Sequence, residues 1–346
     1  MAITAAACGD DGTSGPTGPT GPEVMQNTVD NTIVPGFVAF DEAAQGMRAE
    51  VDGFCGAPST TSLASLQGGW RTLSLSWNAV AAYNLGPLDD DAITPRIIFI
   101  ESMRQRGTDY TDTVREAYAA ALSSGATLDA AYFDALTFNE VGMLALEVLI
   151  FEDSRAGHSQ LPEDIVADFA AEPRKCEYLR GVADLLAQDA SEVRSAWTVS
   201  FQGAEPFRDT MLESKLPDGR EPIAALLVAL QQHFDYIQVR KLQGTLDAQL
   251  SGAFYPNVNA ALLALEALLE QPTPEEAVGI FDFMLAKDLQ SDVDLVRANL
   301  AAAKAAAAAE DRDGLTTAIG LLDGNLKREI PDGLGVDLGI NFTDGD

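Results

Sequence analysis

One short stretch, Asn139 to Glu152, constrains the fold of this chain more than any other. From Val141 to Phe151 every residue is apolar or glycine except Glu147. A helix that is apolar on all sides is buried, and about eleven residues are too few to span a bilayer, which needs about twenty. A carboxylate inside such a helix is costly unless another group pairs with it, protonates it or binds it. The sequence therefore predicts a buried helix with a specialised acidic side chain.

Glu147 shares one helical stripe with Leu144, three residues before it, and with Glu140, seven residues before it. Two interpretations of Glu147 stay open. It can contact a ligand or a metal, or it can form a purely structural ion pair with a buried arginine. The arginines that we consider as partners for such a pair are Arg71, Arg96 and Arg180.

The composition predicts an all-α protein. Alanine and leucine dominate the 346 residues, 7% are aromatic, and 47% are hydrophobic, enough for one large or two ordinary domains. No stretch alternates apolar and polar residues over strand length. About ten helices with short connections suggest two helical bundles. Helical spacing of apolar residues predicts the ranges 28–53, 59–83, 109–124, 127–137, 138–152, 173–197, 221–243, 256–270, 275–288, 291–310 and 312–329.

The chain divides into three predicted segments. Residues 1–24 include a Gly/Pro/Thr linker without apolar periodicity. Residues 203–222 hold three prolines and two glycines, which favours a domain boundary there. We therefore predict an N-terminal bundle over 25–202 and a C-terminal bundle over 203–346.

The chain is strongly acidic, with 22 Lys+Arg against 53 Asp+Glu and a formal net charge of −31. This charge argues against nucleic acid or an anionic membrane surface as a partner, because both bind through clustered Lys and Arg. It favours solubility or the attraction of cations. The run Asp89-Asp90-Asp91 also has two interpretations. It can be a solvated acidic turn or a loop that holds a hard cation, although the spacing of a calcium loop is absent.

The residue patterns of common hydrolases are absent. A zinc peptidase needs two histidines one turn apart, a third ligand and a glutamate base, whereas this chain has only His158 and His233. We expect His233 on an ordinary helix face, and His158 in a loop that can fold back toward Glu147. Nucleophile-elbow and phosphate-loop glycine patterns do not occur. Zinc hydrolysis is therefore not expected, and a two-carboxylate site would need a partner that the sequence does not identify.

Of the three cysteines, Cys8 has a different expected role from Cys55 and Cys176. Cys8 follows three alanines, which resembles the end of a lipoprotein signal, although the charged and apolar regions that precede such a cysteine are missing. In an exported protein, Cys55 and Cys176 are expected to form a disulfide. The alternative for these two cysteines is a pair of buried free thiols.

Several motifs together resemble the imelysin family of bacterial envelope proteins, which is classed among peptidases and tied to iron-regulated operons. The family signature Gly-x-His-x-x-Glu matches at Gly142 and Glu147, while Leu144 stands at the histidine position. The resemblance extends over most of the chain after the first two dozen residues. Its further matches are Cys55, Ser76–Pro87, Cys176-Glu-Tyr-Leu and the ending Leu334–Asp346.

The resemblance implies a lipid-anchored protein of the cell envelope, periplasmic or at the cell surface. It also implies that a small ligand, an iron complex as the leading class, binds in a cleft between two helical bundles. Membrane contact would come only through the anchor at Cys8. Two alternatives stay open, a peptidase of the imelysin class and a protein-interaction scaffold. The candidate ligand-binding residues are Glu147, Glu140, Gly142, Leu144 and His158.

Overall fold

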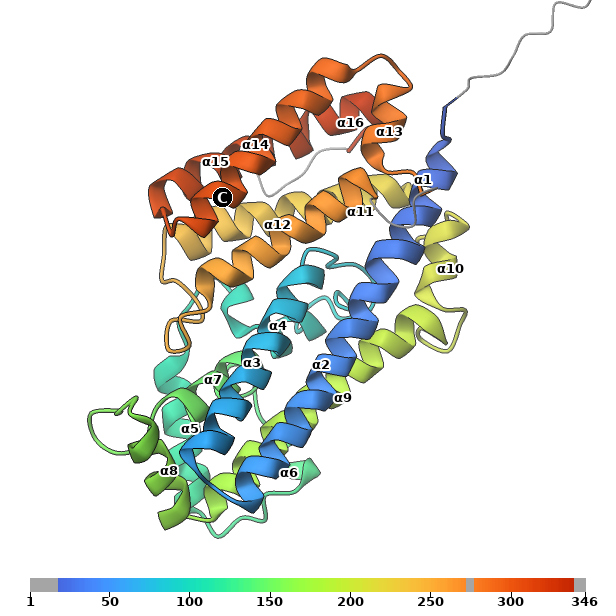
Figure 1. The fold of residues 1–346 in the computed structure, drawn as a ribbon. Helices are drawn as coiled ribbons and strands as arrows, with labels where there is room; N and C mark the ends of the chain where they lie inside the picture. The colour runs from blue at the N-terminus through green and yellow to red at the C-terminus, as the bar shows by residue number, and fades with distance from the viewer. Residues whose placement is uncertain (1–17, 272–276, 339–346) are drawn as a thin grey trace, which may run out of the picture.

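The computed structural model describes residues 18–271 and 277–338 as helices joined by loops (Figure 1). Within these ranges there is no strand, only an isolated bridge between Phe201 and Ala204, so the predicted all-α fold is confirmed. None of the helices in the same ranges combines the length and apolar character needed to cross a membrane.

The N-terminal part is built around three long helices, α2, α3 and α9, with α2 packed against both of the others. Shorter helices cover the ends and sides of this group (Figure 1). The bounds are α1 Gly21–Thr28, the π-helical turn η1 Val29–Ile33, α2 Val34–Gly56, α3 Thr60–Val80, α4 Arg96–Ile100, the 3-10 turn η2 Ser102–Arg104, α5 Thr111–Ser123, α6 Ala130–Asp134, α7 Gly142–Phe151, α8 Pro162–Ala171 and α9 Arg174–Thr198.

The C-terminal part is a layer of four longer helices in which α15 packs on α11 and α14, and α14 packs on α12. Helix α12 also packs against α3, so it joins the two parts of the chain. The bounds are α10 Phe207–Leu212, α11 Pro222–Asp235, the π-helix η3 Tyr236–Leu242, α12 Phe254–Glu270, α13 Ile280–Leu285, α14 Gln290–Ala308, α15 Arg312–Lys327 and α16 Glu329–Leu334.

Helix α3 carries the apolar stripe that organises the core. It starts at Ser59, whose side chain accepts the Ser62 N–H while the Ser62 side chain accepts the Ser59 N–H, a capping box. Because α3 packs against α2 on one side and α12 on another, its tryptophans lie at the centre of the molecule. The stripe is buried along its whole length, at Leu63, Leu66, Trp70, Leu73, Trp77 and Val80.

One continuous helical rod, formed by α1, η1 and α2 from Gly21 to Gly56, runs past both parts of the chain (Figure 1). Its first turns pack against α10, α12 and α13, and its remainder packs against α3 and α9. The rod begins at Thr20, which caps the N–H of Glu23. The prediction of a helix from residue 28 is therefore correct in type but too late in its start.

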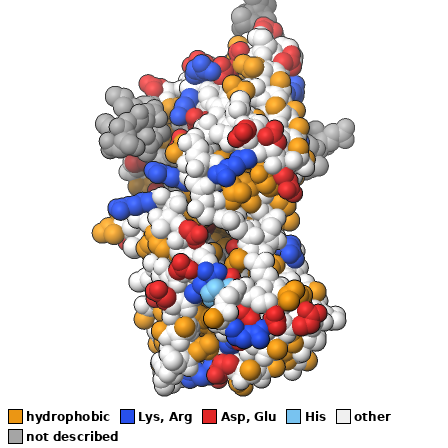
Figure 2. Space-filling model, turned by 90° about the vertical axis from the view of Figure 1, so that its left-hand side faces the viewer, with side chains coloured by type: hydrophobic (Ala, Val, Ile, Leu, Met, Phe, Trp, Pro, Cys, Tyr) orange, Lys and Arg blue, Asp and Glu red, His pale blue; other side chains and the backbone are white. Residues whose placement is uncertain are grey.

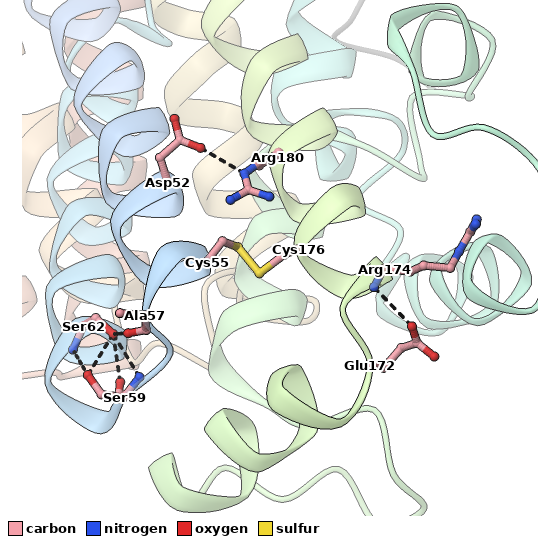
Figure 3. The surroundings of a disulfide bond; sticks show 9 residues. All are labelled: Asp52, Cys55, Ala57, Ser59, Ser62, Glu172, Arg174, Cys176 and Arg180. Carbon is pink, nitrogen blue, oxygen red and sulfur yellow. Dashed lines mark hydrogen bonds and ion pairs between the residues drawn. A yellow bond between two sulfur atoms is a disulfide. The ribbon is translucent and has the colours of Figure 1, made fainter.

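Cys55 near the end of α2 and Cys176 near the start of α9 form a disulfide, which confirms the predicted pairing (Figure 3). An ion pair between Arg180 and Asp52, 2.9 Å from Nε to Oδ1, links the same two helices one turn away. Cys8, the linker through residue 17 and the chain end from residue 339 lie outside the described residues.

Three predicted helices have different bounds in the structure. The helix expected over 127–137 is only the short α6, and the one expected over 138–152 begins at Gly142. The reason is local, because the Glu140 carboxylate accepts the Thr137 N–H at 2.7 Å and holds residues 137–140 in a turn. The helix expected over 275–288 is shortened to α13, and its predicted start lies partly outside the described residues.

Candidate functional site

Gly142 allows α7 to start where it does. Its φ of +77° is a conformation that favours glycine, and a Cβ there would overlap the carbonyl oxygens of Phe99 and Ile100. The start of α7 is therefore pressed against the end of α4. Gly142 acts through this close approach, and its own atoms do not line the pocket described below.

Glu147 lies inside α7 and is 2% exposed. Its Oε1 accepts a hydrogen bond of 2.8 Å from the backbone N–H of Ser251, and Arg71 donates to the carbonyl oxygen of that same serine at 3.3 Å. Arg96 and Arg180 pair with other carboxylates. The interpretation of Glu147 as the partner of one of these arginines is therefore wrong. Glu147 is a buried carboxyl group that accepts a hydrogen bond from a backbone amide.

Burial raises the pKa of Glu147 to about 7. Hydrogen bonding from Ser251 acts in the opposite direction, and the negative charges of Asp247 and Asp109 add to the increase. The side chain therefore gains and loses its proton close to neutral pH. Perturbed carboxyl groups of this kind are enriched at functional sites.

Glu147 and Leu144, one turn apart on α7, line a pocket that offers about 70 Å³ to the centres of water molecules. Its other walls come from α3, from η2 and residues 109–111, and from the loop 246–250 and the start of α12. The pocket is therefore lined by residues on both sides of residue 203. The placement of the domain boundary at residue 203 stays a prediction.

A buried charged cluster lies beside this pocket, and two of its members, Glu101 and Asp247, also line the pocket. Glu101 is its centre, with Oε1 bonded to Lys241 at 2.6 Å and to the Tyr236 hydroxyl at 3.0 Å. Lys241 also pairs with Asp247 at 2.6 Å. We define the charged cluster as Glu101, Arg104, His233, Tyr236, Lys241 and Asp247.

The charges in the cluster stabilise one another. Burial opposes the charge on Lys241, but Asp247 and Glu101 raise the pKa of its ammonium group. Burial also opposes ionisation of Glu101, yet Lys241 and Arg104 lower the pKa of that carboxyl group. Burial and the neighbouring cations lower the pKa of His233 well below its usual range, so its ring is neutral.

His233 was expected on an ordinary helix face, and this prediction is wrong. The side chain is fully buried and its Nδ1 contacts the Arg104 guanidinium, while its Nε2 has no hydrogen-bond partner. After α11 the helix continues as the π-helix η3, which carries Tyr236 and Lys241. Such π-helical segments occur often at functional sites.

Two other predicted site residues lie away from the pocket. Glu140 precedes α7 and closes the turn with Thr137, so it does not share a helical stripe with Glu147. His158 is partly exposed and contacts Asp153 and Glu152 instead of folding back. The structure thus brings Leu144 and Glu147 together, supported by Gly142, and it separates Glu140 and His158 from them.

The residues at the pocket do not form a ready metal centre. Across residues 18–271 and 277–338, no group of three or more His, Cys, Asp or Glu side chains is arranged to hold a metal ion. Leu144 supplies no ligand atom where a histidine would. The pocket offers acidic, amide and aromatic groups for a ligand that donates hydrogen bonds.

No local sequence pattern indicates which distant residues surround Glu147 and the charged cluster. Ser251 lies 104 residues further along the chain, and Asp247 and Lys241 lie in the same distant region. The one signal that could have identified them is a basic residue in the apolar-rich run from Phe234 to Leu242, because a lysine on a buried face requires an acidic partner.

Together, the fold and the site define an all-α protein with a buried acidic pocket where its N-terminal and C-terminal parts meet. The profile of the imelysin family, peptidase family M75, matches residues 33–327. The chain therefore belongs to the imelysin family, as the motifs indicated. A search of curated proteins finds no match.

Two solved structures share the fold. An imelysin-like protein from Psychrobacter arcticum 273-4 superimposes with a TM-score of 0.71 at 13% identity, over 93% of this chain and 99% of that one. A candidate iron-regulated protein A precursor from Parabacteroides distasonis ATCC 8503 has a TM-score of 0.67 at 14% identity, over 93% and 97% of the two chains. These identities support a common fold.

Proposed function

We propose that this chain is a ligand-binding protein of the cell envelope that binds an iron complex through the pocket around Glu147. The observation that carries the proposal is a buried carboxyl group that has no ion-pair partner among residues 18–271 and 277–338 and lines a pocket between distant parts of the chain. The name of the Parabacteroides neighbour as an iron-regulated protein supports iron as the cargo.

The same proposal includes export and a lipid anchor at Cys8. The Cys55–Cys176 disulfide supports export, because such bonds persist in oxidising compartments. On the face shown in Figure 2, Lys and Arg side chains are scattered among acidic ones instead of forming one basic patch. This face therefore does not resemble a basic surface that binds anionic lipids.

Binding is favoured over peptide cleavage by the residues at the site. A metallopeptidase needs several ligands around one metal, and here the motif histidine is Leu144. The pocket is also small, with about 70 Å³ open to the centres of water molecules, which does not favour an extended peptide. A peptidase remains the second candidate only through the class of the family.

The first prediction tests the pocket directly. Glu147→Gln is expected to abolish binding of ferric complexes, because it keeps the shape of the side chain and removes its charge. The matched control is Glu140→Gln, which changes the same residue type just before α7 but outside the pocket. Tryptophan fluorescence titration measures both, since Trp70 and Trp77 line the pocket. Equal affinity in the two variants would refute this function for Glu147.

The second prediction concerns pH. The folded state raises the pKa of Glu147 from 4.5 to about 7, so the folded state binds more protons across this window. Stability is therefore highest below pH 4.5 for this group and falls as the pH rises to about 7, by up to about 3 kcal/mol. Urea unfolding of ligand-free protein at pH 5 and pH 8 should show this decrease, and Glu147→Gln should lack it. Parallel pH profiles would contradict the burial effect.

The third prediction restores the family motif. Leu144→His places an imidazole one turn before Glu147, with both side chains at the pocket. We expect Ni²⁺ or Zn²⁺ to bind at least about tenfold more tightly than to the unmodified protein, because a nitrogen ligand joins a carboxylate. Leu144→Ala, which enlarges the pocket without adding a ligand, is the control. Calorimetry that finds equal metal affinity in all three proteins would contradict this geometry.

A further inference from the structure

Carboxyl groups line the pocket at Glu147, and none of the lining residues in the described part of the chain is a lysine or an arginine. An ionised carboxylate has about four acceptor positions, and the donors that meet Glu147 belong to Ser251. Asp247 also lines the pocket, and its buried Oδ1 has no hydrogen-bond partner within the described part of the chain. Asp109 contributes a third carboxylate near the pocket. A ligand group that donates hydrogen bonds and carries positive charge would complement these carboxyl groups.

The aromatic wall of the pocket fits the same kind of group. The Nε1–H of Trp70 donates to the carbonyl oxygen of Met143 at 3.1 Å, and that of Trp77 donates to Glu101 at 2.9 Å. Both indole N–H groups are therefore occupied, and the rings offer only carbon to the pocket. Indole rings attract an ammonium or guanidinium group through their π-electrons.

The cations near the pocket form their contacts with groups other than the Glu147 carboxylate. Lys241 lies between Glu101 and Asp247, and Arg104 contacts Glu101 on the other side. Neither Lys241 nor Arg104 pairs with Glu147 in the structure. Arg71 donates to the Ser251 carbonyl and lies over the Phe151 ring.

We propose that the ligand is held by a protonated primary amine on a short alkyl arm, which enters the pocket and donates to Glu147, while any metal stays outside. This inference rests on the proposed function and names the chemical group that the site recognises. About 70 Å³ of the pocket is open to the centres of water molecules, a small space that suits an alkylammonium group better than a whole iron chelate. It also agrees with the lack of a three-ligand group in the described part of the chain.

The experiment uses the whole protein and three probes in calorimetric titrations. Ferrioxamine B is an iron chelate with a free terminal ammonium group, and its N-acetylated form is the same chelate without that charge. The third probe, n-butylammonium, represents the arm alone. We expect ferrioxamine B to bind about 10- to 100-fold more tightly than the acetylated chelate, because a charge-assisted hydrogen bond is lost. We also expect n-butylammonium to compete with it, and Glu147→Gln to remove the difference.

The outcomes separate the inference from the proposed function. If both chelates, or ferric citrate, bind equally well and n-butylammonium does not compete, the amine inference is wrong and iron-complex binding stands. If n-butylammonium binds in a Glu147-dependent way and no iron complex binds, the amine inference stands and iron is not the cargo. If no probe binds to the folded protein, both proposals fail.

Discussion

Replacing Cys55 and Cys176 together by serine is expected to lower the free energy of unfolding by about 5 kcal/mol. The disulfide closes a loop between residues separated by 121 positions, and in the loop-entropy model a loop of this length restricts the unfolded chain by about that amount. The loss should appear in the stability of the whole fold, because the exposed Arg180–Asp52 pair beside the bond contributes little. Denaturant unfolding of the oxidised protein and the variant measures it.

Cys8→Ser is the matched control for this pair, because it removes a thiol outside the disulfide and should leave stability unchanged. Thiol counting on unreduced, denatured protein should find neither Cys55 nor Cys176 free. Two reactive thiols besides Cys8, or a double variant as stable as the parent, would contradict the expected role of the bond.

Lys241→Met is expected to destabilise the protein by about 3–5 kcal/mol. The ammonium group is 1% exposed and lies 2.6 Å from both Glu101 and Asp247, so its removal leaves buried carboxylates without their shared cation. Methionine has a similar length, and the change therefore acts mainly through charge. Chemical unfolding at pH 7 measures the loss of stability.

Lys215→Met is the control, since Lys215 forms an exposed pair with Glu213 and its loss should have no measurable effect. A second variant keeps the test informative if Lys241→Met does not fold. Lys241→Met combined with Glu101→Gln and Asp247→Asn removes all three charges and should recover part of the lost stability. If the single and triple variants are equally unstable, packing and not charge explains the effect.

The parts of the fold that follow local rules could be predicted from the sequence. Apolar spacing, which can be read from the sequence, predicts the buried stripe of α3, the buried helix α7 and the all-α class. The disulfide followed from having two cysteines in a chain expected to be exported. The predicted helix bounds are wrong where a side chain competes with the helix for backbone hydrogen bonds. Glu140 does so by accepting the Thr137 N–H.

The site was predictable only in part, for a physical reason. Glu147 was visible because one ionisable group inside an apolar helix is anomalous in any fold. Its partners are set by tertiary packing of α7 against the loop 246–250, and no local pattern encodes that contact. Glu140 and His158 were chosen because they are close in sequence, and the turn before α7 and the loop after it carry them elsewhere.

The rod from Gly21 to Gly56 limits how the molecule can move. It packs against helices of the C-terminal part at its beginning and against α3 and α9 along the rest of its length. A hinge rotation that closed the two halves around a ligand would have to bend this rod, and its π-helical turn Val29–Ile33 is buried at both ends. Such a rotation would also separate α3 from α12. For the proposed ligand we therefore expect entry by movement of side chains and of the loop 246–250, and an affinity that depends on a preformed shape.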